Sequence, residues 1–190
     1  MSDQIDLLER AAHAANHVVS GVKADQLGDP TPCREWTVRN LLNHMVGTAE
    51  VFASAVAGEK ANINPFGTPP DDVIGDDPQA RYADASTRMV TAWRKRGLDG
   101  TVTLVRGEMP APAACTIAMC DHLAHGWDLA QATGQQLQID DEVIEAAWEF
   151  TQANMGPAGR GPGKPFAEAV EVSPDAPRLA QLMAFMGRTP

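Results

Sequence analysis

The sequence predicts an all-α fold, a bundle of four long helices with long connections and short C-terminal helices. Apolar residues recur at three- and four-residue spacing in four separate segments, which is the period of an amphipathic helix. Stretches rich in proline and glycine separate these segments, as expected for loops. A chain of 190 residues, 44% of them hydrophobic, is long enough to bury one core. We therefore expect a single domain over residues 1–190.

Two helices are predicted in the first third of the chain. Residues 4–23 carry an apolar stripe made of Leu7, Leu8, Ala11, Ala15, Val18, Val19 and Val22. Residues 25–36 contain two prolines and a glycine, which indicates a loop. Thr37 is typical of a helix N-cap and predicts that the next helix runs over 38–58.

The remaining elements follow from the same periodicity. Residues 62–78 predict a long exposed loop, 79–95 a third helix, and the β-branched run 101–105 a short extended segment. A fourth long helix is expected over 113–133, closed by Gly134 as its C-cap. Shorter helices are expected over 141–153 and 175–186, with a glycine- and proline-rich loop over 155–165. This order of elements favours a helix bundle, whose core can hold a metal between facing helices.

Charge and composition exclude several classes of protein. The net charge of −10 argues against nucleic acid, because phosphate binding needs a basic face. No apolar run approaches the roughly 20 residues of a membrane span, and the first residues are acidic and polar, unlike a signal peptide. Three cysteines without a C-x-x-C motif favour a reducing compartment over a disulfide framework. We expect a cytoplasmic protein with no membrane or nucleic-acid partner.

The strongest chemical signal is the run from Asp121 to Asp128, together with the distant His44. Asp121 and His125 are four residues apart, so they stack on one face of a helix, and Asp128 falls on the same face. That face also carries alanines and an isoleucine that are typical of a core. A carboxylate and an imidazole pointing into a core are costly unless they have partners. A divalent metal with His44 as the third ligand would satisfy both.

His44, Asp121 and His125 would leave one coordination position open, as in catalytic zinc sites. Two imidazoles and a carboxylate suit zinc and also iron, manganese or nickel. The residues leave a simpler interpretation open, in which His44 is a hydrogen-bonded core histidine and Asp121 and His125 form a helical ion pair. We expect Asp128 to orient a ligand or bind substrate, and a capping or solvated role for it stays equally open.

Other polar residues receive lesser roles. Arg160 and Lys164 lie in the glycine- and proline-rich loop, from which they could hold an anionic thiol or substrate, although solvated charges are the simpler interpretation. His122 lies roughly 100° around the helix from the Asp121 face and is not expected to be a ligand. Cys33 is expected to have a packing role, and Cys120 to point away from the site.

Two segments resemble a known family. Residues 31–47 (TPCREWTVRNLLNHMVG) and 121–130 (DHLAHGWDLA) are similar to the two signatures of the mycothiol-dependent maleylpyruvate isomerase-like proteins, which belong to the DinB-like superfamily of metal-binding four-helix bundles. The C-terminal residues 172–177 and 187–190 are similar to the small single-domain branch of that family. The resemblance spans nearly the whole chain.

The resemblance implies a divalent metal, commonly zinc, on His44, Asp121 and His125. It also implies mycothiol, a low-molecular-weight thiol, as cosubstrate. The sequence departs from the isomerase pattern in having Asp121 where the isomerases carry Glu, and in ending at Pro190 without their further C-terminal domain. These departures argue against maleylpyruvate itself as the substrate.

We therefore expect a metal-dependent enzyme that activates mycothiol for S-transfer or isomerisation of a small electrophile. A thiol that meets the cation loses its proton, so no protein nucleophile is needed. Three alternatives stay open: a metal-dependent hydrolase that activates water, a non-catalytic metal-binding bundle with a small-ligand or stress-response role, and an inert bundle whose histidines belong to the core. A homodimer also stays open, since nothing in the sequence identifies an interface.

Overall fold

A computed structural model of the chain describes residues 3–105, 107–156, 159–161 and 167–190. These residues are helical apart from loops and one two-stranded sheet, so the predicted all-α class is confirmed. The chain forms two compact units, Met1–Gln138 and Ile139–Pro190, and each is described here by itself. The expectation of a single domain over 1–190 stays a prediction.

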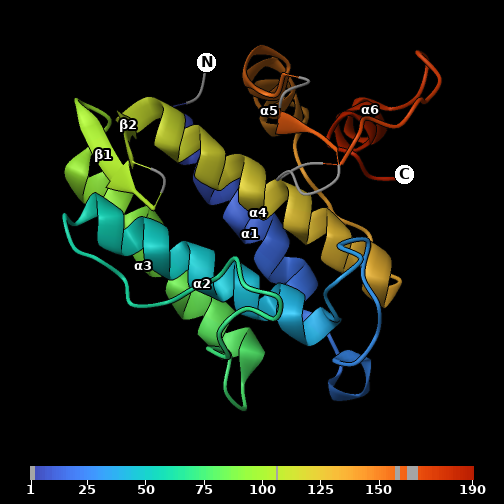
Figure 1. Cartoon of the computed structure of the whole chain (residues 1–190), viewed down its shortest axis with the longest axis horizontal. Coiled ribbons are helices and arrows are strands. Elements are labelled where there is room, and N and C mark those ends of the chain that lie inside the picture. Colours follow the sequence, from blue (N-terminus) through green and yellow to red (C-terminus); the bar gives the residue numbers. More distant parts are fainter. Residues whose placement is uncertain (1–2, 106, 157–158, 162–166) are drawn as a thin grey trace. The chain divides into compact units, whose positions relative to one another are not determined.

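The first unit contains four long helices, a short 3₁₀ helix and a hairpin (Figure 1). In chain order they are α1 (Gln4–Ser20), η1 (Ala24–Gln26), α2 (Val38–Val56), α3 (Pro78–Arg96), β1 (Thr101–Leu104), β2 (Gly107–Pro110) and α4 (Ala111–Thr133). Helix α4 packs mainly on α1, and α2 packs mainly on α3; α1 also contacts α3, and α2 also contacts α4. The four long helices therefore enclose one core.

Small residues bring α1 and α4 close together. Gly126 of α4 lies against Ala15 of α1, where an added Cβ would meet the Ala15 Cβ at 3.1 Å. The largest fully buried apolar side chains of the core include Leu8, Leu41, Leu42, Met45, Met89 and Trp93. Helix α4 is buried around most of its circumference, so its polar residues face protein rather than water.

The predicted helix caps are confirmed. The Thr37 hydroxyl accepts a hydrogen bond from the Asn40 amide, and the Asn40 side chain accepts one from the Thr37 amide, which is a reciprocal capping box. Gly134 ends α4 in the left-handed conformation, with φ of 68°, where glycine avoids the steric cost that other residues meet. These local signals set where α2 begins and where α4 ends.

The hairpin is one feature that the sequence predicted only in part. Residues 101–105 were expected to be extended, and β1 forms there, but it pairs antiparallel with β2, with Val102 opposite Met109. The sequence predicts no second strand, whereas β2 begins at Gly107 and ends at Pro110. Pro110 is tolerated because it sits at the strand end, where a missing amide costs little.

The α2–α3 loop, residues 57–77, packs back onto α2. The side-chain oxygen of Asn43 accepts hydrogen bonds from the amides of Val73 and Ile74, at 2.8 and 3.0 Å. Ile74 and Pro65 are buried. The predicted exposed loop is thus exposed over most of its residues, but Pro65 and Ile74 are buried because contacts with α2 hold them.

The second unit contains α5 (Asp141–Asn154) and α6 (Arg178–Phe185), which pack together. The ring of Trp148 on α5 meets the ring of Phe185 on α6 edge to face, with centroids 5.7 Å apart. Helix α6 is shorter than the predicted 175–186. Pro177 stands at its N-cap position, and a proline disfavours the helical conformation for the residue before it.

Candidate metal centre

The structure brings His44, Asp121 and His125 together, although 77 residues separate His44 from Asp121. His44 lies in the middle of α2, and the other two lie one turn apart on the facing side of α4. The Nε2 atom of His44 is 3.4 Å from Asp121 Oδ1, and the Nε2 atom of His125 is 3.7 Å from the same oxygen. The three form one group of donor atoms within 4.8 Å of one another.

The carboxylate of Asp121 is held in a defined orientation. The hydroxyl of Thr48, one turn after His44 on α2, donates a hydrogen bond of 3.0 Å to Asp121 Oδ2. This contact occupies one oxygen and leaves Oδ1 facing both imidazoles. Burial alone would raise the pKa of Asp121, but the neighbouring His44 outweighs it and holds that pKa well below its usual range. Asp121 is therefore an anion at neutral pH.

The outer nitrogen of each imidazole already has a partner. His44 Nδ1–H donates to the carbonyl oxygen of Pro65 at 2.8 Å. His125 Nδ1–H donates to Asp128 Oδ2 at 3.0 Å. These bonds assign the proton of each neutral ring to Nδ1 and leave the Nε2 lone pair free to bind, as in metal sites where a carbonyl or carboxylate orients the ligand. The Nε2 lone pairs of His44 and His125 and the Oδ1 atom of Asp121 thus face one another.

This arrangement fits a divalent cation. Three acceptor atoms that face one another repel unless a proton or a cation lies between them. A tetrahedral zinc ion with bonds of about 2.0–2.2 Å to nitrogen and oxygen has ligand atoms about 3.3–3.5 Å apart. The His44–Asp121 separation of 3.4 Å falls in that range, and the His125–Asp121 separation of 3.7 Å lies slightly above it. Burial opposes a charge on His44, but Asp121 outweighs it and raises the pKa of His44, so a proton can bridge that pair alone. A cation can accept a lone pair from all three atoms at once.

His125 favours the neutral form that a metal ligand needs. Burial, reinforced by the nearby His44, lowers the pKa of His125 below its usual value. A neutral imidazole keeps the Nε2 lone pair available at physiological pH. The candidate ligands are therefore one carboxylate and two imidazoles, at least one of which is neutral.

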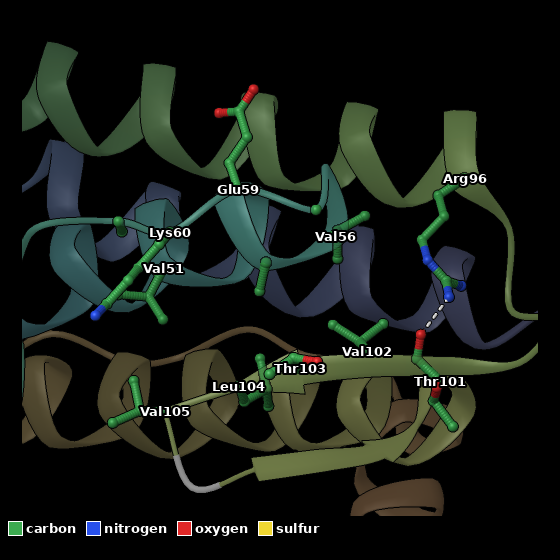
Figure 2. Close-up of a pocket in the computed structure, with 13 residues that line it drawn as sticks. Val51, Val56, Glu59, Lys60, Arg96, Thr101, Val102, Thr103, Leu104 and Val105 are labelled. Carbon is green, nitrogen blue, oxygen red and sulfur yellow. Dashed lines mark hydrogen bonds between the residues drawn. The ribbon is translucent and has the colours of Figure 1, made fainter.

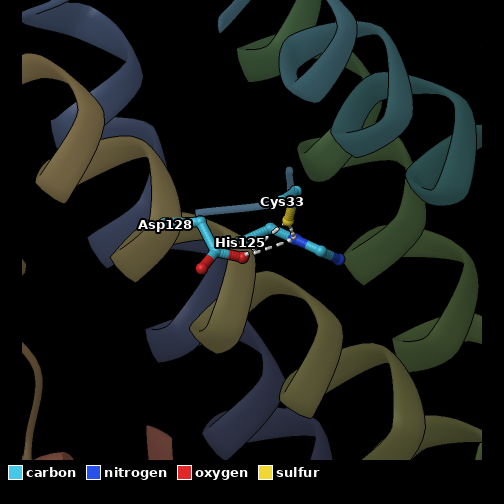
Figure 3. A group of neighbouring side chains, drawn as sticks. All are labelled: Cys33, His125 and Asp128. Carbon is cyan, nitrogen blue, oxygen red and sulfur yellow. Dashed lines mark hydrogen bonds and ion pairs between the residues drawn. The ribbon is translucent and has the colours of Figure 1, made fainter. Parts of the chain in front are cut away.

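A second group of donors adjoins the first and shares His125. The thiol of Cys33 donates to Asp128 Oδ2 at 3.2 Å, and its Sγ lies 3.8 Å from His125 Nδ1 (Figure 3). Asp128 is fully buried. Asp128 contacts His125, and its expected role in orienting a ligand or binding substrate stays a prediction. The packing role expected for Cys33 did not include its contact with this group. A cysteine 92 residues before His125 gives no local signal of that contact.

Aromatic rings from two loops lie over the site. The ring of Trp36, just before α2, is tilted over His44 with centroids 4.6 Å apart, and Phe66 meets His44 edge on at 5.7 Å. Trp36 Nε1–H donates to the carbonyl of Gly67, which ties the two loops together. Phe66 is 57% exposed, so this aromatic pair lies between the imidazole and solvent. The sequence offered no signal for Phe66.

The other candidate residues lie elsewhere. His122 is fully buried beside the Tyr82 hydroxyl, 2.9 Å from His122 Nδ1, and burial lowers its pKa to about 4. Arg160 belongs to the second unit, where it donates to the carbonyl of Ala167 and lies over the Phe185 ring. Lys164 lies outside the described residues. The roles expected for Arg160 and Lys164 stay predictions.

A pocket of about 700 Å³ opens in another part of the first unit (Figure 2). Its walls are the end of α2 with the segment that follows it, and strand β1. Arg96, at one end, donates to the carbonyl of Thr101 and so closes the connection from α3 into the hairpin. The pocket shares no residue with the group of His44, Asp121 and His125.

No helix in the described part of the chain is long and apolar enough to cross a membrane. The three cysteines form no disulfide. Burial raises the pKa of Cys115 and of Cys120 to about 12, which keeps both as thiols. Of the three, Cys33 is the one that lies beside the candidate metal ligands.

Comparison with solved structures shows the fold. The structure of a mycothiol-dependent maleylpyruvate isomerase carrying a histidine-to-alanine mutation matches with a TM-score of 0.60 and 15% sequence identity, over 83% of this chain and 73% of that one. A second structure of the mycothiol-dependent maleylpyruvate isomerase matches with a TM-score of 0.52 and 17% identity, over 76% of this chain and 66% of that one. The predicted DinB-like fold is thereby confirmed.

Sequence comparison finds relatives in Mycobacterium tuberculosis. One uncharacterised protein of that organism is 37% identical over 183 residues, which are 95% of this chain and 95% of the relative. Another is 30% identical over 137 residues, 62% of this chain and 51% of the relative. The family model of the mycothiol maleylpyruvate isomerase N-terminal domain matches residues 8–130, which contain His44, Asp121 and His125. The chain therefore belongs to the mycothiol maleylpyruvate isomerase N-terminal domain family.

Proposed function

We propose that this protein is a metal-dependent enzyme that activates a low-molecular-weight thiol, mycothiol, for S-transfer to or isomerisation of a small electrophile. The observation that carries the proposal is the convergence of two imidazole Nε2 atoms on Asp121 Oδ1, with both Nδ1 atoms already bonded to Pro65 and Asp128. Membership of the isomerase family supports the choice of thiol.

The ligands would be His44, Asp121 and His125, with zinc the ion that best suits two nitrogens and one oxygen. A divalent cation held there supplies the charge that favours thiolate over thiol at neutral pH. Thr48 holds Asp121 so that Oδ1 faces the imidazoles, and Pro65 and Asp128 hold the two rings. These contacts hold the three side chains in place before a metal ion binds.

The rings of Trp36 and Phe66 would line the approach to the site. They lie against the His44 ring and present an apolar surface, which limits the water that reaches it. A partly water-free site strengthens the attraction between a cation and a sulfur anion. Because Phe66 is largely exposed, an arriving substrate could contact its ring. Arg160 and Lys164 remain candidates for holding anionic groups of the thiol or the electrophile.

Metal analysis and a thiol assay test the proposal. We expect the untagged wild-type protein to contain metal and to catalyse mycothiol-dependent turnover of a model electrophile. His44→Ala and His125→Ala should each contain at least one equivalent less metal and lose the turnover. His13→Ala, a matched control at an exposed histidine of α1, should change neither.

Two outcomes would refute the proposal, and each points to an alternative. Metal binding without any effect of thiols on activity, alongside turnover of esters or amides, would identify a hydrolase. Wild-type protein that takes up no zinc, nickel or manganese would leave His44, Asp121 and His125 as core residues and exclude the mechanism proposed here.

A further inference from the structure

We propose that Cys33, His125 and Asp128 form a second cation position, which binds a thiophilic ion through one sulfur, one nitrogen and one oxygen atom. This position goes beyond the proposed function, because Cys33 and Asp128 are not among the three ligands assigned there. The two groups share His125, which offers Nε2 to the first and Nδ1 to the second.

The three separations are those of ligands around one small cation. Cys33 Sγ is 3.2 Å from Asp128 Oδ2 and 3.8 Å from His125 Nδ1, and the nitrogen and oxygen are 3.0 Å apart. A tetrahedral site with bonds of about 2.0 Å to nitrogen or oxygen and about 2.3 Å to sulfur has ligand separations of about 3.3–3.6 Å. Shifts of a few tenths of an ångström would therefore suffice. Figure 3 shows the Cys33 sulfur and the Asp128 carboxylate both beside the His125 imidazole.

The sulfur of Cys33 is held in place by its own turn. The Thr31 hydroxyl accepts a hydrogen bond from the Cys33 amide and lies 2.8 Å from the Trp36 carbonyl, to which it donates. The Trp36 amide donates in turn to the Cys33 carbonyl at 2.7 Å. A closed turn of this kind fixes the Cys33 backbone before any ion arrives, which lowers the entropy cost of binding.

Burial and donor chemistry favour an ion over a purely structural contact. Asp128 is fully buried beside the Cys33 thiol and the His125 imidazole, where a cation would balance the charge of a carboxylate. A sulfur ligand selects soft or borderline ions such as zinc, cadmium and cuprous copper over magnesium or calcium. The half-buried Cys33 leaves a route for the ion from solvent.

Binding at this position is an exchange of protons for a cation. The ion displaces the thiol proton of Cys33 to solvent and takes the place of the Nδ1 proton of His125. That second proton moves to Nε2 of the same ring when the first position is empty, and passes to solvent when the first position is filled. No electrons are transferred and no other reactant is needed. With both positions filled, His125 would offer one ring nitrogen to each ion.

Titration of the full-length protein with Co²⁺ and with Cd²⁺ tests the proposal. We expect wild-type protein to bind two equivalents and to develop a sulfur-to-metal charge-transfer band in the ultraviolet. His44→Ala should bind one equivalent and keep the band, because only the first group is broken. Cys33→Ser should bind one equivalent and lack the band. The double variant Cys115→Ala/Cys120→Ala, which keeps Cys33, should match the wild type.

Other results would overturn the second position without touching the first. A single equivalent in the wild type with no charge-transfer band means that Cys33 binds no ion. A band that survives in Cys33→Ser assigns the sulfur to another cysteine and also refutes the proposal. X-ray absorption of the Cd²⁺ form of His44→Ala should show one sulfur neighbour, and a shell of oxygen and nitrogen alone would refute it. Circular dichroism of each variant verifies that it is folded.

Discussion

The Nδ1 atom of His44 lies 2.8 Å from the carbonyl oxygen of Pro65, so a helix residue at the candidate site is oriented by a loop that follows its own helix. The same loop is held by Asn43, the residue before His44, through the amides of Val73 and Ile74. The orientation of the first candidate ligand therefore depends on how closely the loop packs on α2.

Gly47 permits that close packing. It lies three residues after His44 on α2, and an added Cβ would meet the Pro65 Cβ at 2.9 Å, closer than real Cβ atoms approach. We predict that Gly47→Ala displaces Pro65, breaks its hydrogen bond with His44 Nδ1 and lowers zinc affinity about tenfold or more. A competition titration against a chelator measures this. Gly28→Ala, at a glycine with open space around it, should leave the affinity unchanged, and equal affinities for the two variants would contradict the role of the loop.

Thr48 tests the orientation of the carboxylate. Thr48→Val keeps the shape of the side chain but removes the hydroxyl that donates to Asp121 Oδ2. We predict that the freed carboxylate rotates and that zinc affinity falls by about tenfold, with the fold retained. Thr48→Ser, which keeps the hydroxyl, should restore most of the affinity. If the valine and serine variants bind zinc equally well, the hydrogen bond plays no part in the site.

The cysteines should differ sharply in reactivity. The pKa of Cys115 and of Cys120 is raised to about 12 by burial, so at pH 8 only about one molecule in ten thousand carries either thiolate. We predict that a thiol reagent at pH 8 labels Cys33 alone in the folded, metal-free protein and all three cysteines after denaturation. Peptide mapping by mass spectrometry identifies the labelled sites. Labelling of Cys115 or Cys120 in folded protein would contradict their burial.

Tyr82, the only tyrosine of the chain, should make stability fall at high pH. It is fully buried, and burial raises its pKa well above the ordinary value near 10. The folded state thus holds the proton more tightly than the unfolded state. The contribution of Tyr82 to the free energy of unfolding is complete below about pH 10. Above about pH 10 that free energy falls by about 1.4 kcal/mol for each pH unit.

An alkaline titration followed by tyrosinate absorbance checks this prediction. Ionisation of Tyr82 should coincide with unfolding seen by circular dichroism. Tyr82→Phe should remove this part of the pH dependence, and it should cost about 1–2 kcal/mol at neutral pH because His122 loses its partner. Tyrosinate that appears in protein with full helical signal would contradict the predicted shift.

The sequence by itself determined the four long helices, the Thr37 cap, the Gly134 end and the shared face of Asp121, His125 and Asp128. These features depend on residues within a few positions of one another, and the periodicity of a helix places them without reference to the rest of the chain. Pairing His44 with that face was also a sequence-based hypothesis, drawn from a mid-helix histidine and from family resemblance, and the structure brings the residues together.

Only the tertiary structure decided which distant residues contact the side chains of His44, His125 and Asp128. Cys33 meets His125 and Asp128 across more than ninety residues, and Pro65 meets His44 through a loop whose composition suggested exposure. The strand β2 likewise forms because β1 is beside it, despite a glycine and a proline at its ends. Such contacts depend on how helices and loops pack, and packing couples residues that carry no common periodic signal. For that reason the helices follow from local sequence, while the surroundings of the candidate metal ligands follow from the fold.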